Sequence, residues 1–238
     1  MSERIREGHS GTGPGAITPD GCAVEFYARI PAGSEPDVVE AAVPAGSRIL
    51  ELGSGVGRIT HELVRRGFTV TAVDESPAML ERVRGARTVC SAIEDLDLGE
   101  RFDVVLLGSH LVHTADPAER QGLLAACRRH VAVDGQVLIQ REAEDWRTAA
   151  DLPRERELPG GGLVRVARSV PVSPGVNSVH VEYVFPDATW TQTFLSRPLS
   201  PEEFEDALAG AGLLVDACLT DDRTWVRARP VPGLPGLV

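Results

Sequence analysis

The sequence "ILELGSGVGRIT" (residues 49–60) decides how the rest of the chain is interpreted. An apolar run, typical of a buried strand, ends at Leu52, and glycines follow at positions 53, 55 and 57. The residues after the third glycine have the spacing of a helix. Glycines at a strand-to-helix turn let the backbone pass close to a ligand while the helix N-terminus points at that ligand. The stretch therefore predicts a ligand-binding turn.

The segments around this turn predict an α/β fold. Strand-like and helix-like segments alternate from residue 47 to residue 142, and the strands are nearly continuous runs of valine, isoleucine and leucine. Such strands are typical of a doubly wound, mostly parallel sheet with helices on both faces. Two further strand-like segments after residue 212 bring the expected sheet to seven strands. Period-two alternation within residues 163–197 predicts a small antiparallel β cap inserted after the fifth strand.

Composition excludes several classes of function. The formal net charge of -11 repels phosphate backbones, so nucleic acid is not expected as a partner. The chain contains no run of about 18 apolar residues and no N-terminal signal, which predicts a cytoplasmic protein without membrane contact. The four cysteines lie far apart without a C-x-x-C pair, so neither a disulfide framework nor a metal site is expected.

Two common glycine-rich turns do not fit residues 49–60. A phosphate-binding P-loop requires a lysine after its last glycine, and this chain contains no lysine. A nicotinamide dinucleotide fold requires glycine or alanine at position 58, where this chain has Arg58. A glycine turn needed only for packing stays open as an alternative.

The segment E-L-G-S-G-V-G-R resembles motif I of the class I, Rossmann-like methyltransferases that use S-adenosylmethionine. The resemblance extends over residues 47–142 and, more weakly, through the last helix and strands. It points toward small bacterial tailoring enzymes of natural-product biosynthesis. It implies S-adenosyl-L-methionine as the cofactor, with the glycines packed against its aminoacyl part. Asp74 follows Gly53 by 21 positions, where the family places the acid that accepts both ribose hydroxyls.

The resemblance implies further cofactor contacts. The loop after the third strand and Met79 are expected near adenine, and the backbone of residues 108–109 near the sulfonium. Tyr27 corresponds to an N-terminal aromatic over the cofactor, although plain core roles stay open for Tyr27 and Met79. The expected cofactor-binding residues are Tyr27, Glu51, Gly53, Ser54, Gly55, Gly57, Arg58, Asp74, Glu75, Ser76, Met79, Ala92, Ile93, Glu94, Gly108 and Ser109.

These assignments divide a single expected domain into four parts. Residues 1–46 form an N-terminal arm and helix that act as a lid, and residues 47–142 form the cofactor-binding core. Residues 143–199 form the antiparallel cap, and residues 200–238 form the final helix and strands. The glycine-rich first nineteen residues lack periodicity, which predicts a mobile arm. The arm and the cap are expected to close over the acceptor, while a homodimer interface on the cap strands stays open.

Candidate catalytic residues follow the fourth and fifth strands. His110 and His113 lie at the end of the sheet where ligands of open α/β folds bind, so either can act as a general base. Structural roles for both stay open. Glu142, Glu144 and Asp145 follow the fifth strand and predict an acidic rim that attracts a cationic acceptor, unless they form a solvated loop.

We therefore expect an enzyme that methylates an amine on a small molecule or a peptide, with Glu142 pairing with the ammonium. The first alternative is an O-methyltransferase acting on a hydroxyl or carboxyl of a natural product. A nicotinamide-dependent oxidoreductase and a non-catalytic cofactor-binding protein are the remaining alternatives.

Overall fold

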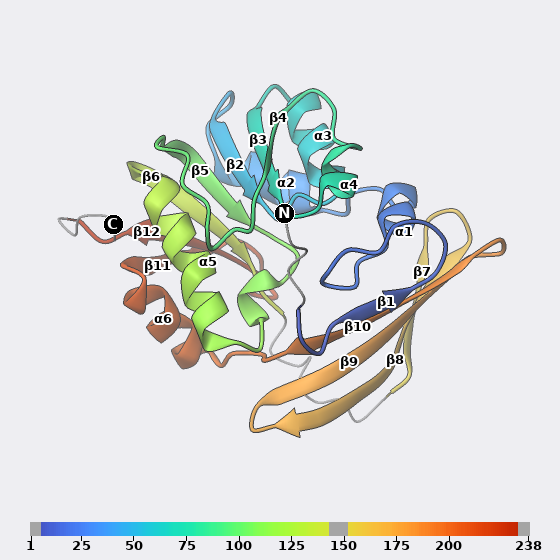
Figure 1. Ribbon diagram of the computed structural model, residues 1–238. Helices are drawn as coiled ribbons and strands as arrows, with labels where there is room; N and C mark the ends of the chain where they lie inside the picture. Colours follow the sequence, from blue (N-terminus) through green and yellow to red (C-terminus); the bar gives the residue numbers. More distant parts are fainter. Residues whose placement is uncertain (1–5, 143–151, 233–238) are drawn as a thin grey trace. The chain divides into compact units, whose positions relative to one another are not determined.

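The computed structural model describes residues 6–142 and 152–232. The chain divides into two compact units (Figure 1). The larger unit consists of residues 32–144 and 199–238, and the smaller one of residues 1–31 and 145–198. In the part of the chain that is described, no helix is both long enough and apolar enough to span a membrane.

The larger unit contains a seven-stranded sheet with the order β11-β12-β6-β5-β2-β3-β4. Neighbouring strands from β6 to β4 are parallel, whereas β12 is antiparallel to both β6 and β11. The α/β class and the seven-stranded sheet are thus confirmed. The strands are β2 (Arg48–Leu52), β3 (Thr69–Asp74), β4 (Arg87–Cys90), β5 (Phe102–Leu107), β6 (Val131–Gln140), β11 (Leu213–Cys218) and β12 (Trp225–Pro230).

Three α-helices of this unit begin after residues whose side chains accept hydrogen bonds from their first amide groups. Asp116 accepts a hydrogen bond from Ala118 N at 2.8 Å, and Ser200 with Glu203 forms a complete capping box. The helix that Ser76 caps is short, because the backbone continues after Leu80 in tighter turns. The helices are α2 (Glu35–Ala42), α3 (Arg58–Arg65), α4 (Pro77–Leu80), α5 (Pro117–His130), α6 (Pro201–Gly210) and the 3-10 helix η1 (Leu111–His113).

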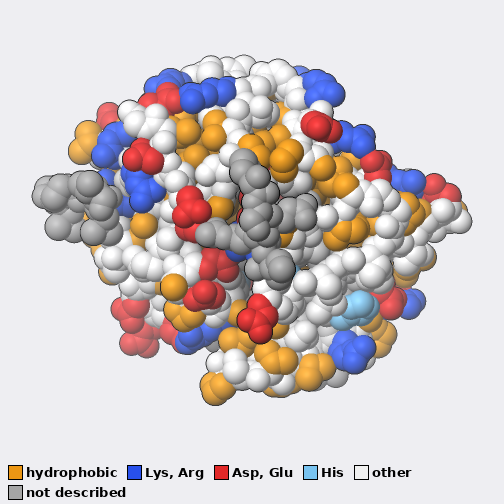
Figure 2. Space-filling view, in the orientation of Figure 1, with side chains coloured by type: hydrophobic (Ala, Val, Ile, Leu, Met, Phe, Trp, Pro, Cys, Tyr) orange, Lys and Arg blue, Asp and Glu red, His pale blue; other side chains and the backbone are white. Residues whose placement is uncertain are grey.

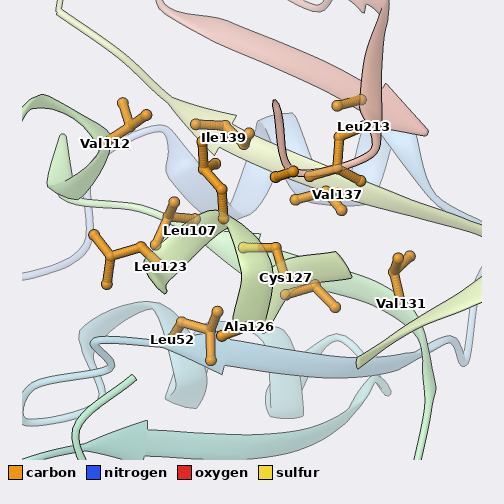
Figure 3. Close-up of a cluster of buried hydrophobic side chains, with 14 of the residues drawn as sticks. Leu52, Leu107, Val112, Leu123, Ala126, Cys127, Val131, Val137, Ile139 and Leu213 are labelled. Carbon is orange, nitrogen blue, oxygen red and sulfur yellow. The ribbon is translucent and has the colours of Figure 1, made fainter. Parts of the chain in front are cut away.

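The core of the larger unit lies in two clusters that take alternate side chains of the strands. Val105 and Leu107 of β5 belong to a cluster that also contains buried residues of α5 and α6. Val104 and Leu106 belong to the other cluster, together with buried residues of α2 and α3. Figure 3 shows the first cluster, in which side chains of α5 such as Leu123 and Cys127 lie among those of the strands. Successive strand residues point to opposite faces, so burial on both sides explains the continuous apolar runs in the sequence.

The smaller unit contains an antiparallel sheet with the order β1-β10-β9-β8-β7. The strands expected within residues 163–197 are present as β8, β9 and β10. The N-terminal segment, expected to lack regular structure, contributes the short edge strand β1, whose residue Ser10 pairs with Thr193. The elements are β1 (Ser10–Thr12), α1 (Val24–Arg29), β7 (Arg154–Leu158), β8 (Gly162–Ser173), β9 (Val176–Val184) and β10 (Thr189–Ser196).

Aromatic side chains form the core of the smaller unit. The Phe26 ring of α1 stacks on the Tyr183 ring of β9, with centroids 3.8 Å apart and an angle of 20° between the planes. Trp190 is fully buried and donates a hydrogen bond from Nε1 to the carbonyl of Pro14 at 2.8 Å. The N-terminal segment is therefore an integral part of this unit, joined to its sheet by backbone pairing and by aromatic packing.

Candidate functional site

The glycine-rich turn between β2 and α3 runs through three left-handed backbone conformations. The φ angles of Gly53, Gly55 and Gly57 are +72°, +56° and +84°, which L-residues with a side chain rarely adopt. The turn is tied to the next strand, because Ser54 N donates to Val73 O at 2.9 Å. The ligand-binding turn predicted from the sequence thus has a backbone conformation that only glycine adopts without strain.

The three glycines differ in what surrounds them. A methyl group at Gly53 would lie 2.7 Å from Leu111 Cδ1, so this glycine lets the loop after β5 pack against the turn. At Gly57, a methyl group would lie 3.1 Å from both His61 Nε2 and Val83 Cγ2. At Gly55, the nearest atom to such a methyl group is the Met79 sulfur at 4.0 Å. Gly55 therefore faces the most open space of the three.

Asp74 ends β3 beside this turn. Its Oδ2 accepts a hydrogen bond from Gly55 N at 2.8 Å, and its Oδ1 accepts one from Ser76 N at 2.9 Å. Ser76 in turn caps α4 by accepting from Met79 N at 3.3 Å. The two backbone amides thus hold the Asp74 carboxylate in place beside the glycine turn. The carbonyl of Glu75, the next residue, accepts from the Cys90 thiol at 3.6 Å.

Glu51 is a buried acid at the end of β2. Burial raises its pKa to about 7, while a hydrogen bond from Thr60 and the charge of Arg58 act in the opposite direction. The Thr60 hydroxyl donates to Glu51 Oε2 at 2.5 Å.

Ser54 lies in the glycine-rich turn. Its hydroxyl oxygen is buried and has no hydrogen-bond partner among the described residues. A buried hydroxyl without a partner is costly, which makes Ser54 a candidate for binding a ligand group.

The loop after β4 places Ile93 against the turn. Ile93 is buried, and its Cδ1 would lie 3.8 Å from a methyl group at Gly53. Glu94 packs against α5, because a methyl group at Gly122 would lie 2.7 Å from its Cβ. Ala92 accepts a hydrogen bond on its carbonyl from the Ser91 hydroxyl at 2.8 Å. Of the three predicted residues in this loop, Ile93 is thus the one that lies beside the glycines.

The loop after β5 has an unusual backbone at two consecutive residues. Ser109 and His110 follow Gly108 and have φ angles of 52° and 58°, a region that residues other than glycine rarely adopt and that is common at functional sites. The side chain of Gln140, at the end of β6, accepts a hydrogen bond from Ser109 N at 2.8 Å. Gln140 is not among the residues expected from the sequence, where its only signal is its polar side chain at the end of an apolar strand.

His110 and His113 differ in their surroundings. His110 is exposed, although protein displaces part of its hydration shell and so lowers its pKa. A hydrogen bond with the backbone of Arg141 and, to a lesser extent, the charge of Glu35 raise the pKa of His110. His113 is buried, with Glu142 N 3.0 Å from its Nε2 and Leu199 N 3.2 Å from its Nδ1. A neutral imidazole has one acceptor nitrogen, so it accepts one of these two amides at a time. His113 therefore ties together the ends of two distant segments.

Some predicted residues belong to the other unit or lie outside the described residues. Tyr27 belongs to the smaller unit, where its ring lies 5.0 Å from that of Phe26 and burial raises its pKa well above its ordinary value. Glu144 and Asp145 of the expected acidic rim lie outside the described residues.

A cavity of about 360 Å³ opens at the opposite edge of the sheet, where the Glu100 carboxylate pairs with the Arg48 guanidinium at 2.8 Å.

The charge on the surface is mixed. The sequence carries 35 acidic and 24 basic side chains, and both kinds lie on the face drawn in Figure 2.

The loops after β2, β3, β4 and β5 form one candidate site, which consists of a glycine turn, a fixed carboxylate and apolar side chains. This arrangement is suited to a ligand that has both polar hydroxyl groups and apolar parts.

Residues 49–135 match the family model described as a methyltransferase domain. This chain carries a methyltransferase domain. The match includes the glycine turn and Asp74 as well as the loops that contain Ile93 and His110. The resemblance to methyltransferases that E-L-G-S-G-V-G-R predicts is therefore confirmed over residues 49–135.

Curated relatives match the methyltransferase domain over part of their length. An uncharacterized methyltransferase of Mycobacterium bovis is 35% identical over 103 residues, which cover 41% of this chain and 42% of that protein. A ubiquinone biosynthesis O-methyltransferase of Pseudomonas syringae is 33% identical over 110 residues, which cover 42% and 46%. The methyltransferase domain thus matches less than half the length of these two relatives.

A solved structure has the same fold over most of the chain. It is an amino pentose methyltransferase from Micromonospora echinaspora, involved in calicheamicin biosynthesis and solved with S-adenosylmethionine bound. The TM-score is 0.61 at 21% identity, and the match covers 82% of this chain and 88% of that protein. At this identity the similarity establishes the fold.

Proposed function

We propose that the chain is an S-adenosylmethionine-dependent methyltransferase that methylates an amine nitrogen on a small molecule or a peptide of secondary metabolism. Its sheet is doubly wound, with α2 and α3 on one face and α5 and α6 on the other, as the two core clusters suggest. The observation that carries the proposal is the cradle at Gly55, which leaves open space beside the carboxylate of Asp74.

The residues of the cradle fit the cofactor that we propose. Asp74 would accept the ribose hydroxyls, and the buried Ser54 hydroxyl offers a polar contact that the described residues do not satisfy. Met79 and Ile93 supply apolar surface on either side of the turn. The bound cofactor would supply a methyl group on a sulfonium that is already activated for transfer. The protein has then to hold the acceptor in line and to exclude water.

The remaining predicted cofactor contacts stay proposals of differing strength. Gly53 and Gly57 shape the turn through packing against Leu111, His61 and Val83. Arg58 acts on Glu51 electrostatically, which is compatible with a shared role near the cofactor carboxylate. Tyr27 lies in the other unit, and its contact with the cofactor rests on the family resemblance alone.

Two features favour an amine as the acceptor. Glu142 follows β6 at the same edge of the sheet as the glycine turn, and an acid there attracts an ammonium group. The net charge of -11 disfavours phosphorylated acceptors. We propose His110 as the base, because its side chain is exposed, whereas both ring nitrogens of His113 lie against backbone amides.

O-methylation is the second candidate. A ubiquinone biosynthesis O-methyltransferase and an amino pentose methyltransferase both resemble this chain, so the cofactor half is common to enzymes with different acceptors. A phenol would use the same base and the same cofactor cradle at Gly55. A phenol would not pair with the negative charge of Glu142, whereas an ammonium group would. The effect of Glu142 on acceptor binding therefore separates the two candidates.

Calorimetry tests the cofactor. We expect S-adenosylmethionine and its demethylated product to bind, and titration with NAD or NADP to produce no heat of binding. Asp74→Ala should weaken the cofactor by about 2 kcal/mol or more, since the hydroxyls lose a charged acceptor. The matched control is Asp103→Ala, which removes an acid from the opposite edge of the same sheet. Equal affinities in the parent and in a folded Asp74 variant would remove Asp74 from the site.

Turnover tests the acceptor. A panel that pairs each amine with a phenol or alcohol of the same skeleton, with methyl transfer followed by mass spectrometry, separates the two candidates. We expect the amines to be methylated faster. Turnover of the oxygen acceptors alone would replace the amine proposal by O-methylation. Cofactor binding without any turnover would favour a non-catalytic cofactor-binding protein.

A further inference from the structure

Gln140, the last residue of β6, joins this strand to the loop after β5. Its side-chain oxygen accepts a hydrogen bond from Ser109 N at 2.8 Å. The sheet fixes the backbone on both sides of this contact. Trp225 of β12 pairs with Gln140, and the preceding residue of β6 pairs with Leu107 of β5. The carboxamide therefore reaches the loop from a backbone that both neighbouring strands hold.

Gln140 meets the loop where the loop backbone is least favourable. Ser109 and His110 have φ angles of 52° and 58°. Residues with a Cβ adopt this left-handed region at a cost in free energy, so two in succession persist only where surrounding contacts hold them. Among the described residues, Gln140 provides the side-chain contact to the Ser109 amide. Loss of this contact would leave the amide to solvent and allow the left-handed step to relax.

The loop has a second anchor one residue after His110. Leu111 lies against the glycine turn, since its Cδ1 would lie 2.7 Å from a methyl group at Gly53. Its amide donates to Gly108 O at 3.2 Å, which closes a turn around Ser109 and His110. His110 thus lies between an anchor on β6 and an anchor on the glycine turn. The direction of its side chain follows from the backbone angles that these two anchors maintain.

We propose that Gln140 is a positioning residue that holds the left-handed step at Ser109 and His110 and thereby presents the imidazole to the acceptor. This inference rests on the proposed function, in which His110 is the base. A base accepts a proton only within hydrogen-bond reach, at about 2.6–3.2 Å between heavy atoms. A loop that leaves its left-handed conformation carries the imidazole out of reach and lowers kcat. Gln140 acts on the reaction through the backbone and carries no proton itself.

The test compares three substitutions on β6. Gln140→Met removes the oxygen acceptor but keeps an unbranched side chain of similar length. Gln140→Glu keeps an oxygen that can accept the bond from Ser109 N. Gln136→Met is the matched control, because Gln136 lies on the same strand but its side chain donates to Ala42 O of α2 at 3.2 Å. If Gln140→Met fails to fold, Gln140→Ala removes the same acceptor with a smaller side chain.

Two readouts separate positioning of the base from a purely structural role. The first is the rate of hydrogen exchange at the Ser109 amide, followed by NMR. The second is kcat for an amine per folded molecule, with thermal stability measured in parallel. The exchange rate reports on the loop alone and requires no turnover.

We expect exchange at the Ser109 amide to be about fivefold faster in Gln140→Met, and kcat to fall by about fivefold or more, since one hydrogen bond is lost. Gln140→Glu should return both toward the parental values, and Gln136→Met should leave both unchanged. A parental exchange rate in Gln140→Met would overturn the proposal. Faster exchange with a parental kcat would also overturn it, because the bond would then serve the fold alone. If the parent turns over no amine, the proposed function fails, whereas the exchange rate still shows whether Gln140 holds the loop.

Discussion

His110 and His113 lie three residues apart in the same loop, yet the structure gives them opposite surroundings. His110 is exposed, sits on a left-handed backbone and is subject to the charge of Glu35. His113 is buried against the amides of Glu142 and Leu199. From the sequence alone, both residues are equally good candidates for a general base. Their difference arises from contacts with β6 and with the start of α6, which the local sequence does not contain.

The contacts of His113 lie at a particular place in the chain. Glu142 is near the point where the chain leaves the larger unit, and Leu199 is the residue at which it returns. Arg141 adds a second tie, since its guanidinium donates to Leu199 O at 3.2 Å and lies 4.8 Å from the centre of the Phe204 ring. Within the larger unit, these residues hold together the exit and the return of the chain. His113 thus stabilises the fold, whereas we propose that His110 acts on a ligand.

Replacement of His110 should produce the largest effect. We expect His110→Asn to lower kcat by about 100-fold or more, within the range of about 10²–10⁴ that general base catalysis contributes. The Kd of S-adenosylmethionine and the thermal stability should stay at the parental values. His180→Asn is the control, because His180 lies in the smaller unit and bonds to Thr193 at 2.9 Å. A kcat within a factor of three of the parent would exclude His110 as the base.

We expect Glu51 to make the free energy of unfolding depend on pH, independently of the histidines. Its pKa is raised from 4.5 to about 7 by burial, so the folded state binds the proton more tightly than the unfolded state does. The resulting stability is fully present below pH 4.5 and is lost as the pH rises through about 7. At about 1.36 kcal/mol per pH unit, the free energy of unfolding should change by about 3 kcal/mol over this range.

Glu51→Gln should flatten this dependence, because an amide carries no proton to release. Urea unfolding at several pH values between 4 and 8 measures the effect. A parental slope in the variant would show that another group causes it. The same variant also sharpens the comparison of His110 with His113, since any pH dependence of kcat that remains near pH 7 then comes from groups other than Glu51.

His113 should affect stability more than chemistry. His113→Ala removes the acceptor for a buried backbone amide and leaves a cavity, so we expect a loss of about 2 kcal/mol in the free energy of unfolding. Urea unfolding at pH 7 provides the measurement, and kcat per folded molecule should fall less than tenfold. If His113→Ala kept the parental stability and lost as much kcat as His110→Asn, the roles of the two histidines would have to be exchanged.

The sequence predicted the parts of the site that depend on neighbours in the chain. The glycine turn and Asp74 follow from strand ends and from backbone conformations that only glycine adopts easily. Gln140 meets Ser109 across 31 positions, and Leu199 meets His113 across 86, so neither contact has a local signature.

The smaller unit was predictable only in its strands. Period-two alternation marks β8, β9 and β10 because one face of each strand is buried. Strand β1 has three residues, of which the middle one is half buried, and so carries no alternation that a sequence pattern could detect. Its pairing with β10 depends on tertiary contacts such as the close approach of Gly11 to the carbonyl of Gly21.

The smallest expected effect concerns Glu142, whose amide lies 3.0 Å from the ring of His113. If its carboxylate pairs with the ammonium of the acceptor, Glu142→Gln should raise KM for an amine by more than tenfold, since a charged hydrogen bond contributes about 1.5–3 kcal/mol. The amide isostere keeps the backbone contact with His113, so stability should not change. KM for a phenol of the same skeleton is the control and should stay constant. An unchanged KM for the amine would show that the Glu142 carboxylate does not bind the acceptor and that Glu142 contributes only its backbone contact with His113. This result would favour O-methylation, because an oxygen acceptor requires no negatively charged partner at this position.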